Sequence, residues 1–280
     1  MFKKFTKIPM FSLVAVALVG LPAGATAEEF DEFEPFIEIN ATDGDIGYHV
    51  LLDGEAWKVA KIFDADGDRM FKGKGTDDLE EQGITEIFME SAEPPCWFEE
   101  ANDEVDWDED EVVDLEEFID RFEEGTYTAR GRTLEGERLR AEAEFTHNIP
   151  AAPETRVEVV DRTVTIHFSS GTDLGQCEYP ADLIPNPADV EVVRWEVVLE
   201  PNEDELPGGE LPDGLAFAVF TIQLPASENW MNEMSVVVPQ VYVEAYLGAE
   251  VNQFKYEVGA KEESGNQTFT EATFEIEIED

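Results

Sequence analysis

One segment of the chain spaces its acidic residues in the pattern of a calcium-binding loop. Between Glu99 and Glu124 there are fifteen acidic residues and one basic residue. Calcium prefers about six to eight oxygen ligands, and alternate side chains of a tight loop direct them to one centre, which a final Glu closes. The segment therefore predicts a Ca2+ site, with one backbone carbonyl included, at Asp106, Asp108, Asp110, Val112, Asp114 and Glu117.

This spacing resembles the loop of EF-hand and dockerin proteins, which implies bound calcium and an outgoing helix that begins near Asp114. The sequence departs from that pattern at Glu111, where the family has Gly, and at Pro94-Pro95, which leave little room for an incoming helix. A second interpretation therefore stays open. In it Asp114 caps the helix, Glu117 completes a capping box, and the other acids are solvated.

A second acidic turn is a weaker metal candidate. Asp64, Asp66 and Asp68 repeat the first three ligand positions of a calcium loop. Gly75 stands where the closing carboxylate is expected, so a plain turn between strands is the alternative.

A third candidate lies earlier in the chain. The segment from Ala41 to Gly47 reads Ala-Thr-Asp-Gly-Asp-Ile-Gly and is similar to the Ala-Thr-Asp-x-Asp-x-Gly segment of cadherin repeats. In that family the acids bind calcium between domains, so the resemblance implies metal ligands at Asp43 and Asp45. Tyr48 replaces the Asn that follows in cadherins, and an ordinary turn is the alternative interpretation.

The sequence offers no catalytic motif. His49, His147 and His167 do not have the spacing of a zinc hydrolase, and we expect His167 to lie on a strand face. There is no G-x-S-x-G elbow and no P-loop. With 66 acidic residues, any two carboxylates could meet in space as a glycosidase pair, so their abundance carries no argument. We expect a protein that is not an enzyme.

The N-terminus has the three parts of a cleavable secretory signal over residues 1–27. Lysines 3, 4 and 7 form the basic region, Phe11 to Leu21 is apolar, and Ala25-Thr26-Ala27 is a cleavage site. The apolar stretch is too short to span a bilayer, so we expect a periplasmic or secreted protein with no membrane insertion after cleavage. In an oxidising compartment, Cys96 and Cys177 could form a disulfide.

The charge of the chain is strongly negative. Cleavage would remove three lysines and no acids, which changes the net charge from −48 to −51. Such a field repels nucleic acid and anionic membranes, and we expect neither as a partner. It suits a salty medium, in which screening relieves the repulsion, and it equally suits a protein that collects divalent cations.

The pattern of apolar residues divides the mature chain into two parts. Residues 28–35 read as an acidic tail, and residues 36–147 as an α+β domain that carries the acidic loop. Within it, Ile84, Ile87 and Phe88 have helical spacing, and a second helix is expected from Leu115 to Phe122. The segment 148–153 contains two prolines and is expected to be a linker.

Residues 154–280 predict about seven strands and no helix. The run Phe254-Lys-Tyr-Glu-Val-Gly-Ala260, followed by a turn at residues 263–268, resembles the F strand and F–G turn of fibronectin type III domains. The aromatic that such domains usually supply as Tyr is Phe254 here. The resemblance implies a binding or spacing module without chemistry. The fold class expected for the whole chain is mainly β with some α, with an antiparallel β-sandwich in the second half.

These observations favour an exported, non-catalytic calcium-binding protein with a structural or binding role, whose partner is a protein or a glycan. Two alternatives stay open. One is an exported hydrolase, or its accessory subunit, with catalytic carboxylates in the first half. The other is a halophilic exported protein whose acids only solvate it.

Overall fold

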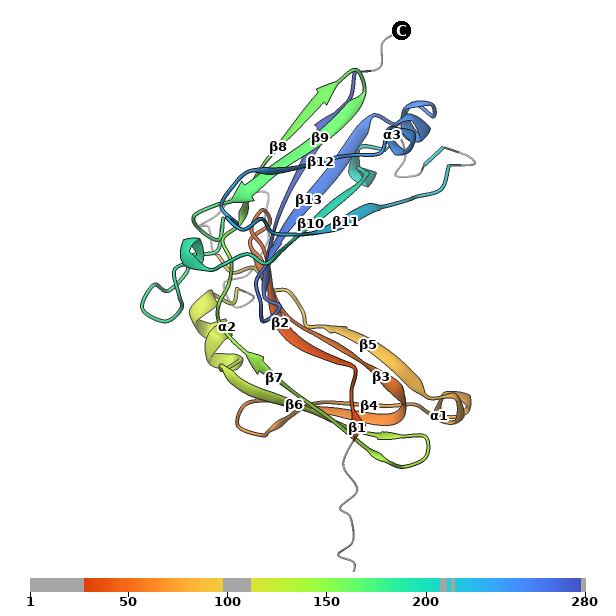
Figure 1. Cartoon of the computed structure of the whole chain (residues 1–280), viewed down its shortest axis with the longest axis vertical. Helices are drawn as coiled ribbons and strands as arrows, with labels where there is room; N and C mark the ends of the chain where they lie inside the picture. Colours follow the sequence, from red (N-terminus) through yellow and green to blue (C-terminus); the bar gives the residue numbers. More distant parts are fainter. Residues whose placement is uncertain (1–27, 98–111, 207–210, 213–214, 278–280) are drawn as a thin grey trace, which may run out of the picture.

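Apolar residues that alternate with acidic ones build 50% of the described structure into β-strands, and the mainly β class that the sequence predicts is confirmed. The structure, a computed structural model, describes residues 28–97, 112–206, 211–212 and 215–277. Two β-rich lobes follow one another along the long axis of the molecule, and β2 lies at their junction (Figure 1).

In its described residues, the first lobe contains seven strands and two short helices. They are β1 (Glu28–Glu29), β2 (Glu32–Asn40), β3 (Asp45–Phe63), β4 (Arg69–Lys74), α1 (Asp78–Gln82), β5 (Ile84–Glu90), α2 (Leu115–Arg121), β6 (Gly125–Thr133) and β7 (Arg138–Phe145).

The part of the second lobe that the structure describes contains the remaining strands, one α-helix and two short 3-10 helices. They are β8 (Pro153–Val160), β9 (Thr163–Ser170), η2 (Pro187–Asp189), β10 (Arg194–Pro201), η3 (Glu203–Glu205), β11 (Phe220–Pro225), β12 (Met234–Val237), α3 (Gln240–Leu247), β13 (Gln253–Lys261) and β14 (Gln267–Glu275).

The 19-residue strand β3 organises the first lobe. Its first part pairs with β2 and β5, and after an irregularity between Asp53 and Trp57 its second part pairs with β4 and β6. Fully buried Trp57 and the side chains of Tyr127 and Phe145 fill the core. Helix α2 covers this core with the apolar face that the sequence predicts, on which Leu115, Phe118 and Ile119 are buried.

The second lobe is a β-sandwich, as its pattern of short alternating strands predicts. The three strands β8, β9 and β12 form one sheet, and β11, β10, β13 and β14 form the other. Trp195, Phe168 and Phe254 are fully buried between them, and the rings of Phe168 and Trp195 lie 5.2 Å apart.

Two connections join the lobes. Strand β14 pairs in parallel with β2 through Gln267, Thr268 and Phe269, so one eleven-stranded sheet runs through both lobes. The segment after β9 returns to the first lobe, where Leu174 and Cys177 enter its core. There Cys177 forms a disulfide with Cys96, and their Cα atoms lie 5.3 Å apart. The segment 148–153 separates the lobes in the sequence, but strand pairing crosses it.

The structure differs from the sequence-based expectations in three segments. Residues 28–35 are not a tail, because Phe30 and Phe33 are buried and the segment forms β1 and the start of β2. Residues 84–90 form strand β5 instead of a helix, since pairing with β3 outweighs the helical spacing. The second half does contain a helix, α3, which buries Val243, Tyr246 and Leu247. Among the described residues, no helix is both long and apolar enough to cross a membrane.

The disulfide predicts a measurable part of the stability. It links residues 81 positions apart, and in the chain-entropy model a loop of that length stabilises the folded state by about 4 kcal/mol. Replacing Cys96 and Cys177 together by Ala should lower the free energy of unfolding in urea by about that amount. A reductant should shift the midpoint of the wild type toward that of the double variant. A wild-type midpoint that does not respond to reductant would contradict the assignment.

Candidate functional site

Part of the acidic loop of residues 106–117 lies outside the described residues. This part includes Asp106, Asp108 and Asp110. Of its other proposed ligands, Asp114 caps α2 and accepts a hydrogen bond of 2.8 Å from the backbone N–H of Glu117. The carboxylate of Glu117 forms an ion pair with Arg121, and Val112 precedes the helix. The cap at Asp114 fits the second interpretation, but the carboxylate of Glu117 pairs with Arg121 instead of completing a capping box. Calcium binding by this loop stays a prediction.

The turn between β3 and β4 holds Asp64, Asp66 and Asp68 at the surface. The Asp64 carboxylate accepts a hydrogen bond of 2.7 Å from the backbone N–H of Asp68, and Gly67 has a φ of +83°. These are the contacts of a hairpin turn, and they already use one of the carboxylates.

Asp43 and Asp45 lie in the turn between β2 and β3, which several neighbours fix. The side chain of Asn40 accepts hydrogen bonds from the backbone N–H groups of Thr42 and Asp43, at 3.0 and 3.2 Å. Gly44 has a φ of +73°, and a Cβ there would overlap the indole of Trp97, whose Nε1 donates to the Asp43 carbonyl at 3.2 Å.

Both segments that the disulfide joins form hydrogen bonds with this turn. The backbone N–H of Cys96 donates to the carbonyl of Gly44 at 2.8 Å. On the other arm of the bridge, Gln176 donates through its side chain to the carbonyl of Thr42. The disulfide-linked segments, and not only the sequence of the turn, therefore fix the positions of Asp43 and Asp45.

Asp43 and Asp45 open into a pocket of about 300 Å³ between the lobes. The first lobe contributes the end of β2, the turn and Glu93, and the second lobe contributes β13 and β14. The described lining contains six carboxylates and a single basic side chain: Glu38, Asn40, Asp43, Asp45, Glu93, Lys255, Glu257, Phe269 and Glu271. Lys255 is already engaged, since its ammonium lies 2.7 Å from Glu271 and 3.1 Å from Glu257.

His49 lies beside this pocket, and its histidine-carboxylate cluster was not expected from the sequence. The side chain is 2% exposed and packs against Phe36 and Phe88. Its Nε2 lies 3.0 Å from Glu93 Oε1, and its Nδ1, which has no hydrogen-bond partner, lies 4.0 Å from Glu38 Oε2. A buried ring nitrogen without a partner is unfavourable, and either a proton directed at Glu38 or a metal ion would satisfy it. The Glu38 oxygen that faces it already accepts a hydrogen bond from the side chain of Gln267.

The three side chains lie close enough together to hold a metal ion. One ligand atom from each of Glu38, His49 and Glu93 lies within 4.8 Å of the others. Only the alternation of β2 and β3 could have indicated this arrangement. Phe36 is paired with His49, and Glu38, two residues further along β2, lies on the same face. Glu93 follows β5, and no motif in the sequence links it to His49.

Mutual repulsion and burial disturb the ionisation of the pocket. Burial raises the pKa of Asp45 to about 6, and the charges of Glu93 and Asp43 add to that rise. Burial likewise raises the pKa of Glu38, although His49 offsets part of the effect. Burial opposes the charge of Lys255, but hydrogen bonds to Glu271 and Glu257 raise the pKa of its ammonium above its usual value. A divalent cation would reverse the repulsion among these acids.

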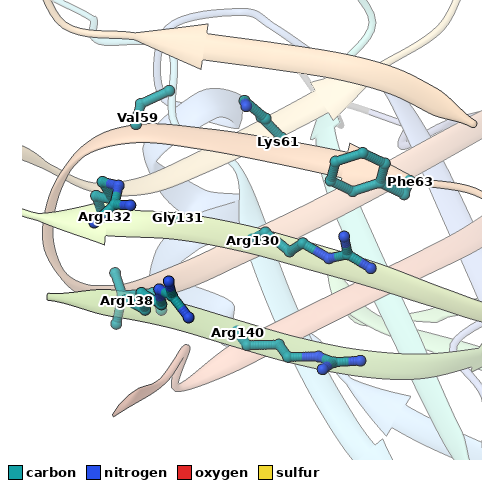
Figure 2. A pocket seen from close by; sticks show the side chains of 9 residues that line it. Val59, Lys61, Phe63, Arg130, Gly131, Arg132, Arg138 and Arg140 are labelled. Atoms are coloured by element: carbon teal, nitrogen blue, oxygen red, sulfur yellow. The ribbon is translucent and has the colours of Figure 1, made fainter. Parts of the chain in front are cut away.

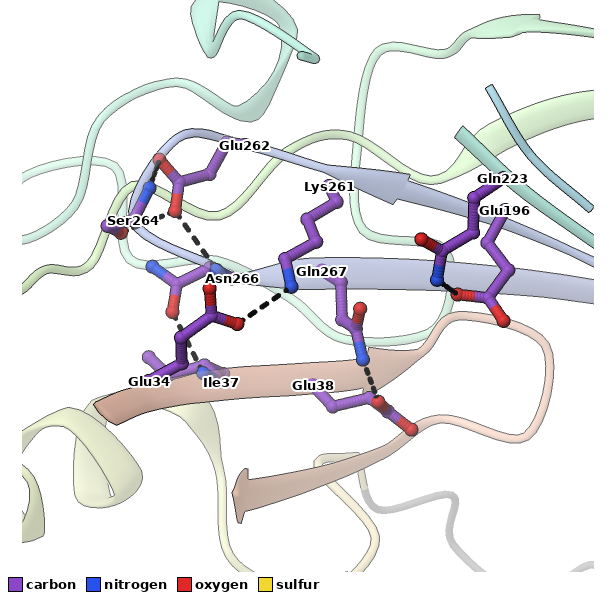
Figure 3. A network of polar contacts seen from close by, with 10 residues as sticks. All are labelled: Glu34, Ile37, Glu38, Glu196, Gln223, Lys261, Glu262, Ser264, Asn266 and Gln267. Atoms are coloured by element: carbon purple, nitrogen blue, oxygen red, sulfur yellow. Dashed lines mark hydrogen bonds and ion pairs between the residues drawn. The ribbon is translucent and has the colours of Figure 1, made fainter. Parts of the chain in front are cut away.

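A buried polar network behind the pocket fixes the junction, and Figure 3 shows its central residues. Asn266 is fully buried; its Oδ1 accepts from the backbone N–H of Ile37 at 2.8 Å, and its Nδ2 donates to the carbonyls of Thr146 and Asn148. One side chain therefore ties β2, the segment after β7 and the β13–β14 turn together. Nearby, Lys261 pairs with Glu34 at 3.3 Å.

The other two histidines lie elsewhere. His147 is buried, and its Nε2 contacts the carbonyl of Phe122 at 2.7 Å. His167 lies in β9, where its ring nitrogens contact Glu158 and Glu233 at 3.4 and 3.6 Å. The strand position of His167 is the one expected from the sequence.

No protein-family model and no curated protein matches the chain. Among solved structures, the chain is similar to one from work on a 1.5-MDa bacterial ice-binding adhesin, with 11% identity, a TM-score of 0.23, and coverage of 89% of this chain and 65% of that one. Trypsin-activated α-2-macroglobulin from Escherichia coli is similar at 12% identity, with a TM-score of 0.30 and coverage of 90% and 16%. The BSP domain of a biofilm associated protein is similar at 12%, with a TM-score of 0.22 and coverage of 87% and 29%. The chain spans less than two thirds of each of these, and at such scores the likeness says nothing about function.

The raised pKa of Asp45 predicts how stability depends on pH. A carboxyl group whose pKa is higher in the folded than in the unfolded protein makes the folded state less stable as the pH rises through that interval. Without divalent ions, the free energy of unfolding should therefore fall between pH 3.8, the ordinary value for Asp, and about 6. For Asp45→Asn the free energy of unfolding should fall less over this interval, and above pH 6 the variant should be more stable than the wild type. Urea unfolding at a series of pH values measures this, and parallel profiles would contradict it.

The hydrogen-bond network around Asn266 should contribute strongly to the stability of the folded protein. Asn266→Ala leaves a buried N–H and two carbonyls without a partner, so the free energy of unfolding should fall by about 2–4 kcal/mol. The matched control is exposed Asn229, whose replacement by Ala should cost less than about 0.5 kcal/mol. Similar losses in the two variants would show that the network does not stabilise the junction.

Proposed function

We propose that this is an exported, non-catalytic protein that binds a divalent cation, calcium, in the pocket between its lobes and thereby fixes the lobes for a structural or binding role. One observation carries the proposal: six carboxylates from both lobes line one pocket, and its single lysine is already paired with Glu257 and Glu271. In this pocket a cation would replace repulsion between the lobes by attraction.

The chemistry of the lining favours calcium over zinc. Carboxylate oxygens suit calcium, which accepts many of them in a flexible geometry, whereas a zinc site would depend on the imidazole nitrogen. The ligands would be Glu38, Asp43, Asp45 and Glu93, with Glu271 supplied by the second lobe. The resemblance of residues 41–47 to the calcium-binding segment of cadherin repeats agrees with this set, because there too the acids act between domains.

Two features support export and a module without chemistry. The geometry of Cys96 and Cys177 suits a disulfide, which persists in oxidising compartments outside the cytosol. The second lobe packs three strands against four, with Phe254 at the start of β13, and this agrees with a fibronectin type III-like sandwich. Proteins of that architecture commonly act as binding or spacing modules.

A second candidate function rests on the same pocket. A carboxyl group with a pKa of about 6, as at Asp45, also fits the general acid of an exported hydrolase. The two functions differ in the effect of calcium. If Asp45 binds the ion, calcium should lower the pKa of its carboxyl group, which NMR can follow, whereas a general acid near neutral pH must keep it raised.

Thermal unfolding with and without calcium tests the proposal at all three acidic candidates. Calcium should stabilise the wild type by about 2.7 kcal/mol at a hundredfold excess over its dissociation constant. Asp45→Asn should lose most of this response. Asp66→Asn and Glu117→Gln remove one charge each from the other two segments and should keep it.

The outcomes separate the alternatives. A response lost only in Glu117→Gln would move the calcium site to the acidic loop and contradict the junction site. A response to zinc that His49→Gln removes, without one to calcium, would make this a transition-metal site. Sodium chloride at matched ionic strength is the control, and an equal effect of both salts would leave the acids as solvating groups.

A further inference from the structure

The outer face of β4, β3, β6 and β7 gathers basic residues in a protein that is otherwise acidic. Fifteen lysines and arginines remain in the chain after residues 1–27, and seven of them lie on this face. We call it the basic face. The sequence gives one signal for it, in the alternating pairs Arg130-Gly-Arg132 and Arg138-Leu-Arg140.

Strand register arranges these residues in two rows. Residues directly opposite one another on paired strands share a face. The first row crosses four strands through Lys72, Lys61, Arg130 and Arg140. The second row lies two residues further along and contains Lys74, Arg132 and Arg138. Neighbouring charges within a row are therefore about 5 Å apart at the backbone, and the rows are about 7 Å apart. The exception is the pair Lys74 and Arg132, which are about 10 Å apart because Val59 lies between them.

Most of these cations have no acidic partner. Among the described residues, Arg140 pairs with Glu142 and Lys74 with Glu80, whereas none of the other five forms an ion pair. Like charges on opposite strand positions destabilise a sheet, and this protein has many acids that could have relieved that repulsion. An anionic ligand would offset this cost.

The basic face is hollowed where the ligand would lie. A depression of about 550 Å³ lies over β3, β6 and β7, with basic side chains along it (Figure 2). The guanidinium of Arg130 lies 4.6 Å from the ring centre of Phe63, which orients the arginine and covers that face of the ring. The floor is closed by the sheet, since Leu139 is 2% exposed.

We infer that the basic face binds a linear acidic polysaccharide that carries carboxylate or sulfate groups along its chain. Arginine forks bind such groups through paired hydrogen bonds, and two regular rows of cations match charges that repeat along an extended chain. An extended glycan can lie on the depression without a protruding element of the protein. The inference does not depend on the cation site between the lobes.

Other anionic partners fit the face less well. Reading of duplex DNA requires a helix or ribbon that enters a groove, and single strands need free aromatic rings, whereas Phe63 is already covered by Arg130. A membrane surface would need apolar side chains that insert beside the basic ones. A second copy of this chain brings a net charge of −48 with it. That charge opposes association.

The test compares two double variants in the presence of a chelator, so that calcium cannot bridge protein and ligand. Arg130→Gln with Arg138→Gln removes one cation from each row. Arg162→Gln with Arg194→Gln removes two exposed cations from the second lobe and is the matched control. Polygalacturonate supplies carboxylates, dextran sulfate supplies sulfates, and neutral dextran supplies neither. Duplex DNA and phosphatidylglycerol vesicles complete the set of probes.

We expect the wild type to bind polygalacturonate or dextran sulfate but not neutral dextran, with an affinity that falls as salt rises. The basic-face variant should bind at least about tenfold more weakly, and the control should bind as the wild type does. Thermal melts of both variants check that they are folded. The inference is overturned if the wild type binds neither acidic polysaccharide, if both double variants lose equally, or if DNA or vesicles bind more tightly than the polysaccharides.

Discussion

The parallel pairing of β14 with β2 is the contact on which the rest of this structure depends. It involves only three residue pairs, yet it makes one sheet of two lobes that each have their own core. So short a ladder is weak by itself, and buried Asn266 and the disulfide reinforce it from two sides. Without this pairing, the acids of the β2–β3 turn would not face Lys255 and Glu271 at all.

The same pairing also brings mutually repelling carboxylates together. Joining the lobes forces carboxylates from both into one pocket, where burial and mutual repulsion raise the pKa of Asp45 to about 6. One lysine cannot balance six acids, and it is held by the two from its own lobe. The pocket therefore concentrates a repulsion that elsewhere is spread over the surface.

Local patterns in the sequence predicted the strands and the sandwich because alternation reports directly which face is buried, as in Trp195, Val197 and Leu199 of β10. They failed where tertiary contacts decide between two conformations. Residues 84–90 have helical spacing but complete a sheet beside β3. Helix α3 contains two valines and two tyrosines, which favour strands, and it forms where its buried face packs on the second core.

The site could be predicted only in part for the same reason. The turn acids Asp43 and Asp45 are visible in the sequence as a short motif, whereas their partners come from β13 and β14, more than 200 positions later. The acidic run at residues 99–124 is easier to recognise because its charges are adjacent in the sequence. A high density of acidic residues does not, however, mean that their side chains converge on one point. Convergence needs strand register, and register is set by which faces are buried.

The net charge of the chain also gives no indication of the basic face. A strongly acidic chain is expected to repel every polyanion, and at distances beyond about a Debye length that expectation holds only in dilute salt. At contact, the local arrangement decides, and the basic face places five cations without an acidic partner among the described residues within a few strands of one another. Screening weakens the long-range field of the acids much more than it weakens contacts at a hollowed surface. A saline medium would therefore suppress the repulsion of a polyanion by the whole protein while it preserves much of the attraction at this face. The acidic composition and an acidic ligand are for that reason compatible, provided that the ligand is extended and touches the protein only where the cations are.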